Sequence, residues 1–192
     1  ADYAKVAAGA AALEKLGYKV YVHPQTYKKN GSSAGTAKDK TKALHDLFKN
    51  PAIRAIICAR GGNRAGAMLP YLDFNLIKKN PKILMGYSDI TALLNAIYKE
   101  TALVTFHGPL LQTKLPPRQT TQCFTLLSGA ATDIPMPRAK ILRPGKAAGK
   151  LVGGNLSLIC SLMGTRWQPD FKSAILFLED CDDELSRYDR ML

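Results

Sequence analysis

The stretch from Lys82 to Lys99, KILMGYSDITALLNAIYK, decides the expected fold because it contains one sharp change of pattern. Its first residues, Lys82 to Met85, form an apolar run that is typical of a strand buried on both faces. Residues 90–99 repeat apolar side chains at helical spacing. Ser88 lies on the turn between them. The stretch therefore predicts a strand, a turn and a helix, with a serine hydroxyl exposed at the carboxyl end of the strand.

Helices and short apolar strands alternate on both sides of this unit. The expected helices cover residues 6–16, a segment from Thr36 or Thr41 through Phe48, two short pieces near 65–69 and 74–79, and residues 116–130. The other expected strands cover residues 18–23, 52–59 and 102–106. Such alternation is the pattern of a doubly wound parallel sheet, with its functional edge at the carboxyl ends of the strands. We therefore expect an α/β domain.

A region rich in proline and glycine separates this domain from the last part of the chain. Pro135, Pro137, Pro144 and the glycines of residues 145–154 mark a connection without strong periodicity. We place the boundary so that residues 1–140 form the parallel α/β domain and residues 141–192 a linker and the start of a β-rich second domain. A helix over 155–163 and a strand over 174–178 are expected there. Residues 189–192 resemble the beginning of an amphipathic element, so the chain is expected to be incomplete.

Composition describes a globular protein with one main core. The chain has 192 residues, of which 46% are hydrophobic, and a formal net charge of +12. No apolar run approaches the ~20 residues that a membrane-spanning helix needs. The basic residues are scattered, with no interleaved aromatic stripe and no known nucleic-acid module. We interpret the charge as a solvated surface and expect neither nucleic acid nor a membrane as partner. Long-range attraction of an anionic substrate is the alternative.

The cysteines indicate a reducing compartment. Cys58, Cys123, Cys160 and Cys181 lie in apolar or mixed contexts and form no CxxC pair. This pattern favours reduced, mostly buried thiols over a disulfide framework or a metal site. We therefore expect a cytoplasmic protein without a bound metal.

A second glycine-rich turn is expected at the same sheet edge as Ser88. Arg60-Gly61-Gly62 follows the strand expected over 52–59. Paired glycines let backbone amides approach a ligand closely, which suits an oxyanion hole or a carboxylate cradle. The nucleotide-binding glycine patterns are absent. Two simpler alternatives stay open, since Ser88 or Asp89 could merely cap the helix and the glycines could only form a tight turn.

Acidic and imidazole side chains are also expected near strand ends. Glu179-Asp180 follows the strand expected over 174–178, where a carboxylate could orient a histidine. An exposed acidic pair is the alternative. His107 follows the strand expected over 102–106, whereas His23 and His45 fall at a strand end and in a helix. A structural role is expected for each histidine when it is considered alone.

Six motifs occur in a fixed order along the chain. They are Arg60-Gly61-Gly62, Leu69-Pro70-Tyr71-Leu72-Asp73, Gly86-Tyr87-Ser88-Asp89-Ile90-Thr91, His107-Gly108-Pro109, Gly153-Gly154-Asn155-Leu156 and Phe177-Leu178-Glu179-Asp180. In this order they resemble the LD-carboxypeptidase family of serine peptidases. The resemblance covers nearly the whole chain, from about Leu16 to Leu192.

The resemblance implies a two-domain cytoplasmic bacterial hydrolase without a cofactor. Such an enzyme cleaves L-to-D amide bonds in murein tetrapeptides and releases D-alanine, and a microcin-inactivating branch shares its site. A murein-derived peptide is then the expected partner, and a homodimer is compatible with the resemblance.

The family's site residues map onto this chain one by one. Ser88 is similar to the nucleophile and Glu179 to the acidic member of the triad. Gly62 and the amide of Asp89 are similar to the oxyanion hole. Arg60 resembles a structural residue or a contact for the substrate carboxylate. His107 matches a family position outside the triad, where we expect a substrate-positioning or packing role.

The chain departs from the family pattern in three places. An aromatic residue usually follows the glycine pair, where this chain has Asn63-Arg64, so substrate preference is open. We expect the family's first strand, ahead of the opening helix, to be absent from residues 1–192. The family's catalytic histidine lies in the C-terminal domain, beyond Leu192. We therefore expect residues 1–192 to be inactive alone, with a non-catalytic or microcin-type peptide-binding homologue as the alternative.

Overall fold

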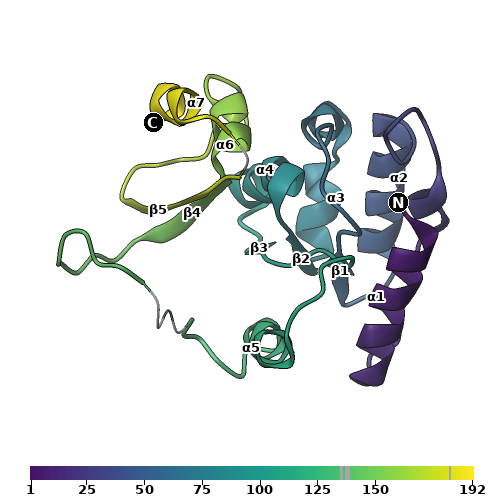
Figure 1. Ribbon diagram of the computed structural model, residues 1–192. Helices are drawn as coiled ribbons and strands as arrows, with labels where there is room; N and C mark the ends of the chain where they lie inside the picture. The colour runs from purple at the N-terminus through teal and green to yellow at the C-terminus, as the bar shows by residue number, and fades with distance from the viewer. Residues whose placement is uncertain (135, 137–138, 182) are drawn as a thin grey trace.

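Parallel strands in two small sheets organise the computed structural model, which describes residues 1–134, 136, 139–181 and 183–192 (Figure 1). The first sheet has the order β1 (Ala55–Ile57), β2 (Ile83–Gly86), β3 (Phe106–His107). Both of its strand pairs are parallel. A second parallel pair consists of β4 (Lys150–Asn155) and β5 (Ala174–Glu179). The expected α/β class with parallel strands is confirmed.

Helices connect and cover these strands. They are α1 (Tyr3–Lys15), α2 (Ala37–Lys49), α3 (Phe74–Lys79), α4 (Thr91–Thr101), α5 (Pro117–Leu127), α6 (Leu156–Leu162) and α7 (Leu185–Met191), with short 3-10 segments η1 (Pro24–Tyr27), η2 (Gly66–Tyr71) and η3 (Ser88–Ile90). The start of α2 is settled in favour of Thr36, whose hydroxyl accepts a hydrogen bond from the amide of Asp39 in a capping box. Among the described residues, no helix has the length and hydropathy needed to cross a membrane.

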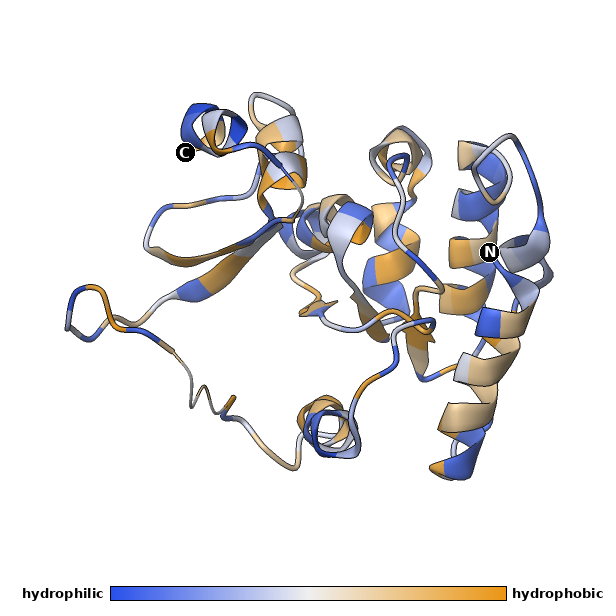
Figure 2. Cartoon of the chain, viewed as in Figure 1, coloured by the Kyte–Doolittle hydropathy of each residue, from blue (hydrophilic) through white to orange (hydrophobic). Residues whose placement is uncertain are grey.

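The core lies between the first sheet and helices α2, α3 and α4. Its largest fully buried side chains include Phe48, Ile77, Leu84 and Ile97. Figure 2 shows the matching hydrophobic segments on α2, α3 and the central strands. Full burial of one such side chain contributes about 1.5–3 kcal/mol. This packing fixes β2 and α4 relative to each other, and with them the turn that carries Ser88.

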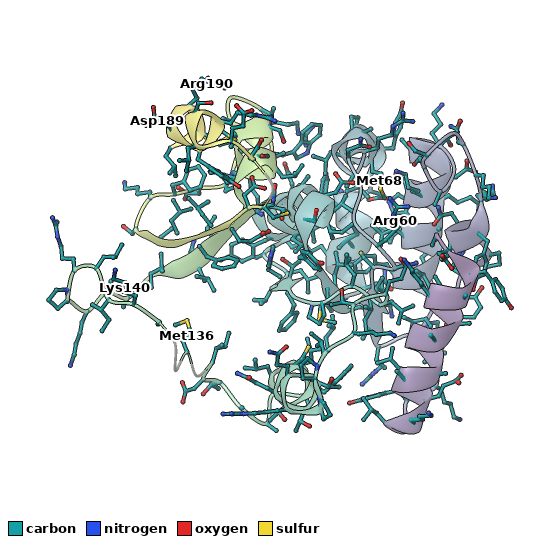
Figure 3. All side chains as sticks on the ribbon, in the orientation of Figure 1. Arg60, Met68, Met136, Lys140, Asp189 and Arg190 are labelled. Atoms are coloured by element: carbon teal, nitrogen blue, oxygen red, sulfur yellow. The ribbon has the colours of Figure 1, made fainter. Side chains whose placement is uncertain are left out.

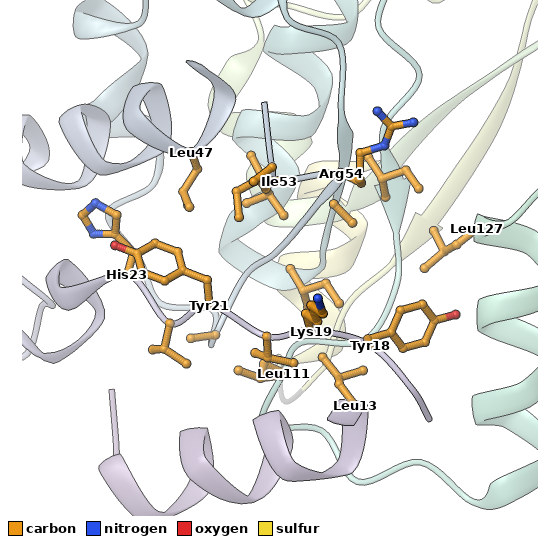
Figure 4. A pocket seen from close by; sticks show the side chains of 18 of the residues that line it. Leu13, Tyr18, Lys19, Tyr21, His23, Leu47, Ile53, Arg54, Leu111 and Leu127 are labelled. Carbon is orange, nitrogen blue, oxygen red and sulfur yellow. The ribbon is translucent and has the colours of Figure 1, made fainter. Parts of the chain in front are cut away.

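The prediction of a strand over residues 18–23 is wrong. These residues form neither a helix nor a strand. They line an apolar cavity of about 470 Å³, and β1 lines it too (Figure 4). Leucines of α1, α2 and α5 contribute to the lining, namely Leu13, Leu47 and Leu127. Neighbouring strands must lie about 4.8 Å apart to exchange hydrogen bonds. Residues 18–23 share the lining of this cavity with β1 but do not pair with it, and β1 is the edge strand of the first sheet.

Other element boundaries also differ from the expectation, among them that of the strand expected over 52–59, which is β1 and covers only Ala55–Ile57. The strand expected over 102–106 starts only at Phe106, because Ala102 ends α4 in the left-handed conformation with φ 59°. The element expected to begin near Asp189 is α7, which already begins at Leu185. Asp189 and Arg190 project outward from this helix (Figure 3).

Strand β4 lies where the glycines of the sequence predict a linker. Gly153 and Gly154 have φ values of 141° and 131°, which L side chains rarely adopt. A Cβ atom at Gly153 would lie 1.8 Å from the carbonyl oxygen of Phe177 in β5. The glycines therefore allow β4 to lie close against its neighbour. The rest of the expected linker, residues 139–149, forms no helix or strand, and Pro135 and Pro137 lie outside the described residues.

We expect Gly153→Ala to destabilise the fold, because the new methyl group collides with the backbone of β5 and forces an unfavourable φ. Steric collision and backbone strain together should cost about 3 kcal/mol or more. Thermal unfolding followed by circular dichroism measures the loss. Gly145→Ala is the matched control, since a Cβ atom there would have no atom of a non-adjacent residue within 4 Å. Equal melting temperatures for the two variants would contradict this account of β4.

Candidate active site

Ser88 adopts a conformation that non-glycine residues rarely adopt. Its φ is 62°, in the left-handed region. The residue directly follows Tyr87 at the carboxyl end of β2 and opens η3, which leads into α4. Gly86 makes the turn possible, because a Cβ atom there would lie 2.9 Å from the side chain of Ile90. The sharp turn from strand to helix expected at Ser88 is therefore present.

The glycine loop after β1 packs directly on this turn. A Cβ atom at Gly61 would lie 3.2 Å from both Cβ and Oγ of Ser88. A Cβ atom at Gly62 would lie 3.3 Å from Oδ2 of Asp89. Both distances are shorter than ordinary van der Waals contact, so the close approach of the loop to the serine turn depends on glycine having no side chain. The two turns expected at one sheet edge do meet.

The carboxylate of Asp89 does not cap a helix. Neither η3 nor α4 has a side-chain hydrogen bond at its N-terminus. Oδ2 of Asp89 instead accepts hydrogen bonds from the amides of Arg64 and Ala65, at 3.0 and 2.9 Å. The alternative in which Ser88 or Asp89 merely caps the helix is therefore wrong. The side chain of Asp89 joins the serine turn to the glycine loop.

Backbone donors remain available beside Ser88. The first amides of a helix have no partner within the helix, and the amide of Asp89 holds that position in η3. The amide of Gly62 makes no hydrogen bond to another backbone group within the described part of the chain. Donors of this kind suit an oxyanion.

Glu179 and His107 lie next to each other although they are far apart in the sequence. Nε2 of His107 lies 3.4 Å from Oε1 of Glu179. The contact arises because β3 ends at His107 and β5 ends at Glu179. The imidazole also packs edge-on against Phe177, with ring centroids 5.2 Å apart. The structure thus brings together two of the residues expected in the site.

Burial shifts the protonation of this pair. It lowers the pKa of His107 below its ordinary value, which favours the neutral imidazole. Burial also raises the pKa of Glu179, and the charge of Asp180 adds to that shift. Oε1 of Glu179 and Nδ1 of His107 are buried and make no hydrogen bond. Both side chains therefore keep unused hydrogen-bonding capacity.

Asp180 has a different environment from its neighbour. Its carboxylate accepts hydrogen bonds from the side chain of Asn155 at 2.9 Å and from the hydroxyl of Ser157 at 2.7 Å. The amides of Ser157 and Cys181 donate as well. Burial opposes ionisation of Asp180, but these hydrogen bonds outweigh it and lower the pKa. Asp180 therefore serves to hold β5 against the start of α6.

The remaining expected residues lie elsewhere or are exposed. Arg60 is exposed, and its Nε donates to the carbonyl of Gly61 at 3.3 Å. His23 caps η1 by accepting from the amide of Gln25. Nε2 of His45 accepts from the amide of Asp73. In the described part of the chain, no histidine is hydrogen-bonded to Oγ of Ser88.

Two polar side chains of α4 without an individual role in the sequence-based prediction attach this helix to the backbone of β4. Asn95 donates to the carbonyl of Gly153 at 2.8 Å, and the hydroxyl of Thr91 accepts from the amide of Asn155 at 3.1 Å. Thr91, Asn95 and Asn155 are all buried. A buried asparagine on a largely apolar helix was the available signal, since buried polar groups usually have specific partners.

The cysteines do not belong to a metal site in the described part of the chain. No group of three or more metal-binding side chains gathers among the described residues. Cys58, Cys123 and Cys160 are half-buried and Cys181 is exposed. Burial raises the pKa of Cys58 to about 12, so this thiol stays protonated at neutral pH.

Comparisons with known proteins identify the family of this chain. The LD-carboxypeptidase N-terminal domain matches residues 1–108, and the LD-carboxypeptidase C-terminal domain matches residues 148–192. A probable murein peptide carboxypeptidase of Bacillus subtilis is 40% identical over 94% of this chain and 59% of its own length. The microcin C7 self-immunity protein MccF of Escherichia coli is 33% identical over 93% of this chain and 62% of its own length.

Solved structures give the same result. MccF in complex with glutamyl sulfamoyl guanosine superposes with a TM-score of 0.84 and 29% identity, over 97% of this chain and 66% of the other. Muramoyltetrapeptide carboxypeptidase from Oxalobacter formigenes gives a TM-score of 0.86 and 25% identity, over 100% of this chain and 66% of the other. The chain thus spans about 60% of the length of the curated relatives it matches. By its sequence and its fold, this chain belongs to the LD-carboxypeptidase family.

Proposed function

We propose that this chain is the nucleophile-bearing part of a serine-type LD-carboxypeptidase, which cleaves L-to-D amide bonds in murein tetrapeptides and releases D-alanine. The observation that carries the proposal is the left-handed Ser88 at the end of β2, with Gly61 packed against its hydroxyl. A strained serine at this position in a parallel sheet is the arrangement that exposes a nucleophile. Relatives named as murein peptide and murein tetrapeptide carboxypeptidases support the substrate class.

The proposed chemistry is acyl transfer through Ser88. Its Oγ attacks the carbonyl carbon of the scissile amide while a general base takes the hydroxyl proton. The amides of Gly62 and Asp89 stabilise the negative charge that develops on the carbonyl oxygen. D-alanine then leaves with a proton, and water hydrolyses the acyl-enzyme. No cofactor is needed for these steps.

We assign Glu179 as the carboxylate that orients the general base, and we place the base itself on a histidine outside residues 1–192. His23 and His45 make structural hydrogen bonds away from Ser88. His107 contacts Glu179 and packs on Phe177, which fits a residue that packs the site or positions substrate. Asp180 is fully engaged in hydrogen bonds, which leaves Glu179 as the better candidate.

Substrate attraction, location and organisation complete the proposal. The net charge of +12 suits a peptide substrate rich in carboxylates, and we propose the exposed Arg60 as a contact for one of them. Residues 1–140 and 141–192 are proposed to belong to two domains of a cytoplasmic enzyme that is able to form a homodimer.

The similarity to MccF supports a second candidate function. Structures of that protein are described with glutamyl sulfamoyl guanosine and with aspartyl sulfamoyl adenosine. Asn63-Arg64, at the position where the family usually has an aromatic residue, offers polar groups instead. Cleavage of such aminoacyl sulfamoyl nucleosides in preference to muropeptides would favour this second function. A peptide-binding homologue without catalysis remains the non-enzymatic candidate.

We expect Ser88→Ala to abolish D-alanine release in a longer protein that joins residues 1–192 to a complete C-terminal domain. Loss of the nucleophile should lower kcat by about 10⁴-fold or more while the melting temperature stays nearly constant. Mass spectrometry of products from a muropeptide tetrapeptide, with and without a chelator, measures this. A fully active alanine variant, or activity that the chelator destroys, would rule out the serine mechanism.

Substitution of the two neighbouring carboxylates should affect different properties, activity for Glu179 and stability for Asp180. Glu179→Gln should lower kcat strongly, by about 10²- to 10⁴-fold, because an orienting carboxylate is lost, while stability changes little. Asp180→Asn should instead lower stability by about 1–3 kcal/mol, because its hydrogen bonds hold β5 and α6 together. Steady-state kinetics and thermal unfolding of both variants provide the comparison. Wild-type kinetics for Glu179→Gln would move the acidic role to Asp180.

Residues 1–192 alone should show at most trace carboxypeptidase activity. Without a general base the hydroxyl of Ser88 stays protonated and attacks an amide poorly. Activity should return when a C-terminal domain is added in cis or in trans, as a coupled assay for free D-alanine would show. Robust turnover by the isolated chain that disappears in His107→Ala would overturn this assignment and make His107 the base.

A further inference from the structure

Asp89 has contacts that the reaction outlined above does not use. Only 5% of the residue is exposed, and its Oδ1 is buried without a hydrogen-bond partner. Among the described residues no cation forms an ion pair with it at 4.0 Å or less. A buried and partly unsatisfied carboxylate is costly, so its presence calls for a specific role.

The bonds that Asp89 does make define that role. Oδ2 accepts from two consecutive amides, those of Arg64 and Ala65, at 3.0 and 2.9 Å. These amides lie just after Gly62, on the loop that connects β1 to η2. A carboxylate that accepts two backbone amides forms charge-assisted hydrogen bonds, which are about twice as strong as neutral ones. One side chain therefore fixes the far end of the glycine loop.

The opposite side of the same loop is held by α2. Nζ of Lys40 donates to the carbonyl of Arg64 at 3.4 Å. The peptide groups around Arg64 are thus held between a strong contact from η3 and a longer one from α2. Gly62 also lies close to Asp89, since a Cβ atom at this position would be 3.3 Å from Oδ2 of Asp89.

We infer that the carboxylate of Asp89 is a positioning residue that sets the distance between the two amides of the oxyanion hole. The backbone of Asp89 supplies one of these amides, and its side chain holds the loop that supplies the other, from Gly62. This inference rests on the proposed function for its kinetic consequence. The structural part, a loop held by Asp89, does not depend on catalysis.

Hydrogen exchange on residues 1–192 tests the structural part. Asp89→Ala should speed exchange of the amides of Arg64 and Ala65 by about 10- to 100-fold, the value of one or two charge-assisted hydrogen bonds. Asp89→Asn should speed it less, because the amide oxygen of asparagine still accepts. Asp73→Ala is the matched control, since Asp73 accepts from the amide of Leu76 to cap α3, away from this loop.

Kinetics of the longer protein test the consequence. Asp89→Ala should lower kcat by about 10²-fold, as loss of an oxyanion donor does, with KM nearly unchanged, and Asp89→Asn should recover most of the rate. The inference is overturned if the amides of Arg64 and Ala65 exchange at the wild-type rate in Asp89→Ala. It is also overturned if Asp73→Ala speeds them equally, or if only KM changes. Activity that survives in Ser88→Ala refutes the serine mechanism but leaves the exchange result intact.

Discussion

The left-handed conformation of Ser88 is the constraint on which the rest of the site depends. A φ of 62° costs a non-glycine residue of order 1 kcal/mol or more, so the surrounding packing must hold it. Gly86 allows Ile90 to fold back on the turn, and Gly61 allows the neighbouring loop to close over the hydroxyl. A Cβ atom would lie 2.9 Å from the side chain of Ile90 at Gly86, where an atom would have to shift, and 3.2 Å from Ser88 at Gly61, where the contact would be tight. The strain at one residue therefore dictates small residues in two different turns.

The second sheet joins this turn through buried polar contacts. Thr91 and Asn95, one helical turn apart on α4, bind the backbone of β4. Gly154 lies so close that a Cβ atom would meet Thr91 at 2.8 Å and His107 at 3.1 Å. Because β4 pairs in parallel with β5, this attachment also places Glu179 beside the end of β3. Directional hydrogen bonds at the first turn of α4 thus determine where the carboxylate lies.

Three carboxylates near the site have separate roles because their partners differ. Asp180 is saturated with donors and holds secondary structure together. Asp89 accepts from a loop and leaves one oxygen buried and unpaired. Glu179 has the imidazole of His107 as its near neighbour and a pKa raised by burial. Among these three carboxylates, Asp89 and Glu179 have a buried oxygen without a hydrogen bond. Both lie at the edge where the parallel strands end, which is where such folds place their chemistry.

The sequence by itself determined the parallel α/β class and the turn at Ser88, because buried strands, helical periods and glycine turns are local patterns. It also placed Gly61 and Gly62 at the same edge, since parallel strands end together. Only the tertiary structure decided that residues 18–23 form no strand, because pairing depends on what lies beside a segment. The same holds for β4. Its glycines are typical of a linker in the sequence, and only the close approach of the β5 backbone explains why they lie in a strand. The sequence left open whether the side chain of Asp89 caps a helix. Only its hydrogen bond to the amide of Ala65, 24 residues away in the sequence, showed that it binds a loop instead.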